Sequence, residues 1–256
     1  MFFFDPTYLC FMAPAFILML LTSWYVKSAY NKWSRVRVRS GLTGAQAAQR
    51  LISSSGYSNN AWGVQSSAGG SLAGVQIHRI GGNLTDNYDP RTKVLNLSQG
   101  VADVPSVAAV AVAAHELGHA MQDADDYFPM RFRSALVPMV NIGSWLGWIM
   151  IMAGIVLATM MNASSFGVQI AWLGVLVFSG GALFALATLP VELNASARAK
   201  RLLAETGIIS GQDEINGVNN VLNAAALTYV AGLATALLQL LYFVSLVSGL
   251  GGRRRG

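Results

Sequence analysis

The five residues His115-Glu116-Leu117-Gly118-His119 are the stretch from which the rest of the chain can be interpreted. On a helix, two histidines four residues apart lie one turn apart on the same face, where both can bind a single Zn²⁺. The glutamate that follows the first histidine can then act as a general base toward a water molecule. Only three histidines occur in the 256 residues. Two of them belong to this motif, which therefore predicts a catalytic zinc site with one ion per chain.

The residues before the motif predict a buried helix. From Val104 to Ala114 the sequence is apolar on every side of a helical projection, which is typical of a helix inside a core. Asp103 is a plausible N-cap, and Pro105 falls in the first turn, where a missing N–H does no harm. The apolar run is too short to cross a bilayer, and aspartates follow the motif. We expect the helix to lie in a small domain close to the membrane surface.

The composition indicates an integral membrane protein. Hydrophobic residues make up 54% of the chain and charged residues only 11%, whereas soluble chains carry about 25% charged residues. A membrane-spanning helix needs about 20 mostly apolar residues. Four stretches without Asp, Glu, Lys or Arg meet this need: Tyr8–Val26, Val137–Met161, Gly167–Leu189 and Ala224–Val247. The predicted fold is a mainly α membrane protein with about four transmembrane helices and a small α+β, zincin-like cytoplasmic domain carrying the motif helix.

Basic residues predict the orientation of these spans. Five Lys and Arg residues follow the first span directly, at 27, 32, 35, 37 and 39, and the positive-inside rule places them in the cytoplasm. The predicted division is an N-terminal anchor (1–26), a cytoplasmic metallopeptidase domain (27–136), a transmembrane hairpin (137–190), a cytoplasmic helical segment with the third zinc ligand (191–223) and a C-terminal helix with a basic tail (224–256). The tail, Arg253 to Arg255, would lie outside if the last segment crosses, which conflicts with the rule.

Short elements are predicted between the first span and the motif. Thr43 and Gln46 fit a capping box at the start of a helix over Leu42–Ser55. Two strand-like segments, Val75–Ile80 and Lys93–Leu97, are joined by a turn-rich link and predict a hairpin or a sheet edge. An extended peptide substrate could pair along such an edge.

A catalytic zinc site usually has three protein ligands, so one further ligand is needed. The candidates are His78, an aspartate, or one of three glutamates, at 192, 205 and 214. Glu192 is favoured because it follows Pro190 at the end of the third span, where an unpaired carboxylate is costly. Alternating spans also return this end to the side of the motif helix. A helix over Val191–Thr206 would put Ser196 on the same face as Glu192, as a partner for a zinc ligand.

Several alternatives remain at this stage. Glu192 could instead be an interfacial carboxylate paired with Arg198 or Lys200, and the glutamates at 205 and 214 are expected to be solvated. His78 could be a ligand, a transition-state hydrogen-bond donor or an ordinary strand residue. Tyr88 is a similar candidate for transition-state stabilisation, whereas the stretch from 86 to 89 is typical of an Asx turn ahead of Pro90.

Several segments resemble a family of neutral membrane zinc metallopeptidases, the YugP type. The first is the motif helix, Ala113 to Gln122; the second is Leu84-Thr-Asp-Asn-Tyr-Asp-Pro-Arg91, where the family has histidine in place of Asn87; the others are Arg133 to Ser144 and Leu189-Pro-Val-Glu-Leu-Asn-Ala-Ser196, where Asn194 replaces an aspartate. The resemblance runs from the first span to about residue 205. It implies His115, His119 and Glu192 as zinc ligands and Glu116 as the catalytic acid and base.

Residues and resemblance together predict a membrane-anchored zinc endopeptidase of the gluzincin kind, acting on proteins or peptides at the cytoplasmic face of the cell membrane. An intramembrane protease would need a ligand within a span, and no span contains an acidic residue. A catalytically inactive scaffold or partner-binding protein, with structural or absent zinc, is the main alternative. No motif supports nucleic-acid binding. Membrane-protein partners and a homo-oligomer are both compatible with the pattern.

Overall fold

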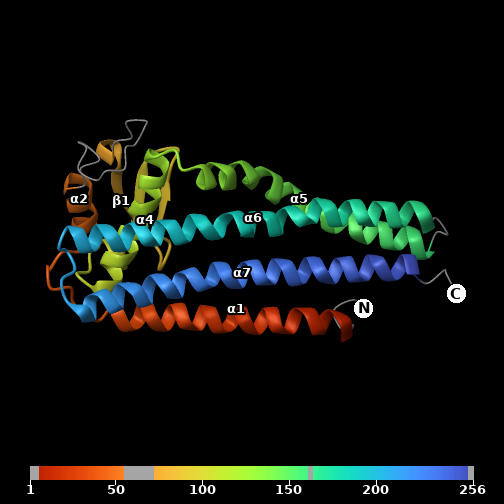
Figure 1. The fold of residues 1–256 in the computed structure, drawn as a ribbon, viewed down its shortest axis with the longest axis horizontal. Coiled ribbons are helices and arrows are strands. Elements are labelled where there is room, and N and C mark those ends of the chain that lie inside the picture. Colours follow the sequence, from red (N-terminus) through yellow and green to blue (C-terminus); the bar gives the residue numbers. More distant parts are fainter. Residues whose placement is uncertain (1–5, 55–71, 161–163, 253–256) are drawn as a thin grey trace. The chain divides into compact units, whose positions relative to one another are not determined.

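The computed structural model describes residues 6–54, 72–160 and 164–252. Within these ranges four helices are long and apolar enough to cross a membrane. They are α1 (Pro6–Trp33), α5 (Phe128–Met160), α6 (Ser164–Glu205) and α7 (Gln212–Gly252). Each contains one of the four apolar stretches that the sequence singled out, apart from Met161, which lies outside the described residues. The mainly helical fold is therefore confirmed. Figure 1 shows these helices together with a group of short helices and strands.

The chain divides into two compact units, and the long helices contribute to both. The first unit, here the apolar unit, comprises Met1–Thr22, Arg131–Leu189 and Thr228–Gly256. Its helices α5 and α6 approach closely at Gly147, where a Cβ atom would lie 2.7 Å from the backbone nitrogen of Phe178. Glycine at position 147 therefore lets the two helices pack closely.

The second unit, here the site unit, comprises Ser23–Met130 and Pro190–Leu227. It contains a sheet of three strands, β1 (Gln76–Ile80), β2 (Asn87–Asp89) and β3 (Val94–Ser98), in the order β1-β3-β2. Strand β2 is antiparallel to β3, whereas β1 is parallel to it.

The two segments were predicted to form a hairpin or a sheet edge. The hairpin is wrong, because β1 and β3 are parallel, whereas β1 does lie at a sheet edge. The link between them contains a third strand, β2, which reaches β3 through a tight turn containing Lys93 at a φ of 55°. Because β2 occupies one side of β3, β1 pairs along the other side, and there it runs parallel to β3. The sheet edges are thus β1 and β2.

Short helices cover this sheet and the motif helix. Helix α2 (Gly44–Ser54) begins with the predicted capping box, in which the Thr43 N–H donates to Gln46 Oε1 at 3.0 Å and the Gln46 N–H donates to Thr43 Oγ1 at 3.3 Å. Two further elements, η3 (Leu72–Gly74) and α3 (Gln99–Ala102), flank the sheet in sequence. Ser55, the last residue of the helix predicted over Leu42–Ser55, lies outside the described residues.

The motif helix α4 (Val107–Ala124) begins later than expected. Its N-cap is Ser106, whose hydroxyl accepts from the Ala109 N–H at 3.1 Å, and not Asp103. Asp103 instead ends α3 and pairs with Arg79 at 2.8 Å. Residues 99–103 form α3 and its C-cap, so α4 begins only after Pro105.

Helix α6 continues through Pro190, where the sequence predicted a break between a span and a separate helix. Proline removes one intrahelical hydrogen bond. Val191 and Ala195, just beyond it, are fully buried, and this packing offsets the loss. The continuous helix carries its last turns into the core of the site unit, where α2, α4, α6 and α7 contribute apolar side chains including Leu51, Leu117, Leu203 and Val218.

Candidate metal centre

Helix α4 presents the two motif histidines on one face. The ring centroids of His115 and His119 lie 4.9 Å apart, and the ring planes are nearly perpendicular, at 86°. Their side chains are only 12% and 11% exposed. The helix is buried on almost every side because its residues from Val107 to Ala114 are small or β-branched and apolar. The imidazoles are thus held in a largely dry environment.

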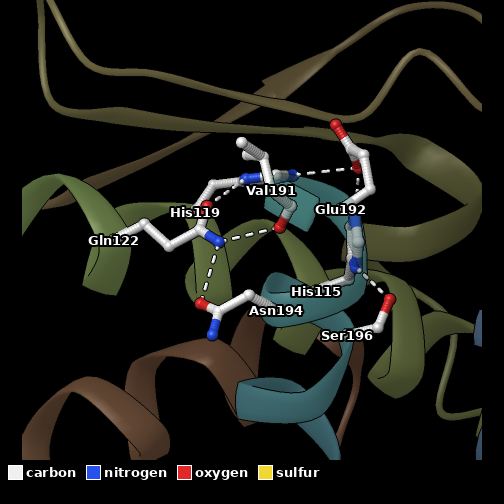
Figure 2. Close-up of polar contacts among 7 residues, drawn as sticks. All are labelled: His115, His119, Gln122, Val191, Glu192, Asn194 and Ser196. Carbon is white, nitrogen blue, oxygen red and sulfur yellow. Dashed lines mark hydrogen bonds and ion pairs between the residues drawn. The ribbon is translucent and has the colours of Figure 1, made fainter. Parts of the chain in front are cut away.

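Glu192 on α6 completes the group. Its Oε2 atom lies 3.3 Å from His115 Nε2 and 3.4 Å from His119 Nε2, and the residue is 2% exposed. Figure 2 shows the carboxylate pointing at the Nε2 sides of both rings. The candidate ligand atoms of these three residues all lie within 4.8 Å of one another. A buried carboxylate beside two imidazoles, brought together from distant parts of the sequence, is an arrangement suited to a cation.

The geometry fits zinc. Zinc binds histidine nitrogen and carboxylate oxygen at about 2.0–2.2 Å in tetrahedral sites, which puts neighbouring ligand atoms about 3.3–3.6 Å apart. The two observed separations from Glu192 Oε2 are 3.3 and 3.4 Å. A set of two nitrogens and one oxygen, with three protein ligands, is also the donor set of open zinc sites.

Each histidine has a second partner at its other ring nitrogen. Ser196 Oγ lies 3.1 Å from His115 Nδ1, as the helical spacing from Glu192 predicted. Gln122 Oε1 lies 2.9 Å from His119 Nδ1. Because the Nδ1 atoms have these partners, both Nε2 atoms are directed toward Glu192 (Figure 2).

Gln122 was not found by sequence reasoning, although its spacing of three residues from His119 was a usable signal. Asn194, which replaces an aspartate of the resembling family, joins the surrounding hydrogen bonds: its Oδ1 accepts from Gln122 Nε2 at 3.0 Å.

A close backbone contact places α6 against α4. Gly118, inside the motif, lies so near Ala195 that a Cβ atom at position 118 would be 2.5 Å from the Ala195 carbonyl oxygen. Only glycine lets the two helices approach this closely, because any side chain would meet backbone atoms. Glu192 is one turn away on α6, so this contact sets its distance from the histidines.

Glu116 is partly buried beside the two candidate ligands. Burial raises its pKa above the ordinary value for glutamate. Charge on His115 and His119 acts in the opposite direction, while the nearby carboxylates of Glu192 and Asp86 add to the rise. A carboxyl group with a raised pKa can both accept and return a proton near neutral pH.

The structure places the other candidate residues as follows. Tyr88 on β2 donates its hydroxyl proton to Asp123 Oδ2 at 2.8 Å, one turn beyond His119, and burial together with this contact raises the pKa of the phenol. His78 is exposed on β1, level with Asn96 of β3. Among the described residues, the group that could hold a metal ion consists of His115, His119 and Glu192.

Asn87, at the position where the family resemblance led us to expect histidine, donates through Nδ2 to the Thr85 carbonyl and accepts from Asn96 Nδ2 at 3.1 Å. The Asx turn is confirmed, since the Arg91 N–H donates to Asp89 Oδ1 at 2.9 Å.

The two basic residues considered as alternative partners of Glu192 have contacts with other residues. Arg198 binds Asn194 Oδ1 and Asp125, and Lys200 donates to Asn223. Glu205 is exposed, as expected.

Glu214 was expected to be solvated, and this is wrong: it is 1% exposed. Its Oε1 accepts from the Arg39 N–H at 2.6 Å, and its Oε2 accepts from the N–H groups of Ser210 and Gly211. Glu214 therefore joins two loops of the site unit and is not a metal ligand.

Comparisons with known proteins identify a family and a relative. A family model described as "Putative neutral zinc metallopeptidase" matches residues 8–248. The chain is 38% identical over 219 residues to "Putative membrane protease YugP" of Bacillus subtilis (strain 168), covering 86% of this chain and 87% of that protein. No solved structure matches. The match spans the motif helix and the helix that carries Glu192, and the chain belongs to the family described as "Putative neutral zinc metallopeptidase".

Proposed function

We propose that this protein is a membrane-anchored, zinc-dependent endopeptidase. His115, His119 and Glu192 would bind one Zn²⁺ per chain, and Glu116 would be the catalytic acid and base. The observation that carries the proposal is the position of Glu192, whose Oε2 lies 3.3 and 3.4 Å from the two Nε2 atoms. An ordinary buried salt bridge would need one histidine, whereas two imidazoles and a carboxylate in contact around one point suit a metal ion.

The residues of the site have distinct chemical tasks. When bound, the zinc ion supplies a Lewis acid that polarises a peptide carbonyl and makes a water molecule more acidic. Glu116 accepts a proton from the attacking water and delivers it to the nitrogen of the leaving amine. Its partly buried position and raised pKa support both roles. The low exposure of the histidines limits competing solvent at the reacting carbonyl.

The site would face the cytoplasm. The basic residues after the first span and the alternation of the four helices support this orientation, with the segments 27–136 and 191–223 on the inner side. Substrates would be proteins or peptides whose backbone pairs along a free sheet edge. Strand β2 is such an edge, and the contact between Tyr88 and Asp123 ties it to α4.

Zinc content and proteolysis of a casein-type substrate would be measured for the wild type and three variants. Glu116→Gln should keep the metal and lose activity by about 10²–10⁴-fold, because only the proton carrier is removed. Glu192→Ala should lose both, because one ligand is missing. The matched control is Glu205→Ala, which replaces an exposed glutamate on α6, the helix that also carries Glu192. It should resemble the wild type. Full activity in Glu116→Gln would contradict the proposal; metal binding without activity in the wild type would favour an inactive scaffold.

A further inference from the structure

A chain of hydrogen bonds connects the candidate ligand His119 to the end of α4. Gln122 Oε1 lies 2.9 Å from His119 Nδ1. Gln122 Nε2 donates to the Val191 carbonyl at 2.8 Å and to Asn194 Oδ1 at 3.0 Å. Asn194 Oδ1 also accepts from Arg198 Nε at 2.8 Å, and Arg198 pairs with Asp125, the C-cap of α4. Figure 2 shows the hydrogen bonds from His119 through Gln122 to Val191 and Asn194.

The chemistry of these partners fixes the direction of each bond. Arginine can only donate, so the atom of Asn194 that faces it must be the oxygen. A backbone carbonyl can only accept, so the atom of Gln122 that faces Val191 must be the amide nitrogen. Both neighbours of Gln122 Nε2 are acceptors. The amide therefore has one orientation, with its oxygen toward His119.

An oxygen at this place determines which ring nitrogen of His119 carries the proton. Gln122 Oε1 accepts and cannot donate, so a hydrogen bond at 2.9 Å requires the proton on Nδ1. In the neutral ring, a proton on Nδ1 leaves the lone pair on Nε2, which is the atom 3.4 Å from Glu192 Oε2. Neutral imidazole with a free Nε2 is the form that binds a metal.

We propose that Gln122 is the positioning residue of His119. Its oxygen fixes the orientation of the ring and keeps the proton on Nδ1, so that Nε2 can bind a metal, and Asn194 and Arg198 fix the orientation of Gln122. This inference rests on the proposed zinc site. His115 differs, because its partner Ser196 has a hydroxyl that can donate or accept and so does not dictate a tautomer. The Gln122 side chain is fully buried, so water does not readily replace it.

Two pairs of variants separate this role from simple packing. Gln122→Met removes the acceptor at similar length, whereas Gln122→Glu keeps an acceptor at His119 and loses the donor to Val191. Asn194→Leu removes the oxygen that orients Gln122, whereas Asn194→Asp keeps an oxygen for both Gln122 and Arg198. A role for Gln122 in orienting His119 predicts that the conservative member of each pair keeps the proton on His119 Nδ1, although Gln122→Glu also loses the two bonds donated by Gln122 Nε2.

Two measurements are made on the full-length protein in detergent: zinc affinity, by competition with a chromophoric chelator, and the slowly exchanging imidazole protons of the zinc-loaded protein, by NMR. With three histidines in the chain, the spectrum is simple. We expect Gln122→Met and Asn194→Leu to weaken zinc binding by about 10–100-fold and to lose the Nδ1–H resonance of His119. Gln122→Glu and Asn194→Asp should keep it. Ser196→Ala should change the His115 resonance and leave that of His119 in place. Glu205→Ala, an exposed position on α6, is the control and should leave zinc affinity and the imidazole resonances unchanged.

The outcomes distinguish a failure of this inference from a failure of the proposed function. Wild-type zinc affinity and an unchanged His119 resonance in Gln122→Met would overturn the inference while leaving the zinc site intact. If both members of a pair lose zinc equally, the residue serves packing and the inference fails. If the wild type binds no zinc, or Glu192→Ala binds it as tightly as the wild type, the proposed function itself fails.

Discussion

Replacing Gly118 by alanine tests whether the approach of α6 to α4 sets the metal geometry. The added methyl carbon would lie 2.5 Å from the Ala195 carbonyl oxygen and 3.1 Å from the Ala195 Cα, whereas ordinary contacts begin at 3.4 Å. To relieve this clash, the helices must separate by about 0.9 Å. Zinc–ligand distances are fixed within about 0.2 Å, so a zinc site cannot absorb a shift of this size. Glu192 is one turn from Ala195 on the same helix, so its carboxylate would move away from both imidazoles.

The expected result is a loss of both stability and zinc affinity. Overpacking costs about 1–3 kcal/mol, or about 2–4 °C in Tm per kcal/mol for a chain of this size. Zinc affinity, measured by chelator competition, should fall by at least about 10-fold. The matched control is Gly232→Ala on α7, where a Cβ atom meets nothing within 4 Å. It should leave zinc affinity unchanged and should not lower Tm, because alanine is the better helix former. Wild-type zinc affinity in Gly118→Ala would refute the reasoning.

Three further predictions concern groups around the site. Glu214→Gln replaces one carboxylate oxygen by a donor and leaves a backbone N–H unpaired, so thermal unfolding should show a loss of about 1–3 kcal/mol; an unchanged Tm would contradict this. Tyr88→Phe removes the hydrogen bond to Asp123, which should cost about 0.5–1.5 kcal/mol with kcat retained; a large fall in kcat would instead show a role for the phenol at the substrate. Asp86→Asn removes a negative charge that raises the pKa of Glu116, so the acid limb of the kcat/KM profile should move to lower pH, and a shift to higher pH would be inconsistent with Glu116 as base.

Much of the fold could be predicted because membrane helices and metal motifs leave local signals. Runs of about 20 residues without charge marked the four long helices, and the spacing of Thr43 and Gln46 marked a helix start. Glu192 could be singled out because a carboxylate at the end of an apolar stretch is costly without a partner. The structure gives it two imidazole partners.

The remaining features depend on contacts between distant residues. The parallel pairing of β1 with β3 depends on how the link between them folds, which alternation alone does not reveal. Glu214 resembled a surface residue because its partners are backbone N–H groups, including that of Arg39, far away in sequence. Gln122 was missed because a glutamine near a helix end is usually solvated; its place three residues after His119 has meaning only once α6 supplies Val191 as acceptor.

The most direct test of the zinc site is X-ray absorption at the zinc edge, measured on the purified protein and on Glu192→Ala. We predict one zinc ion per chain, bound by two imidazole nitrogens and by oxygen at about 2.0–2.2 Å, and a marked loss of bound zinc in the variant. A zinc ion bound by sulfur, or a spectrum that is the same with and without Glu192, would contradict a site formed by His115, His119 and Glu192.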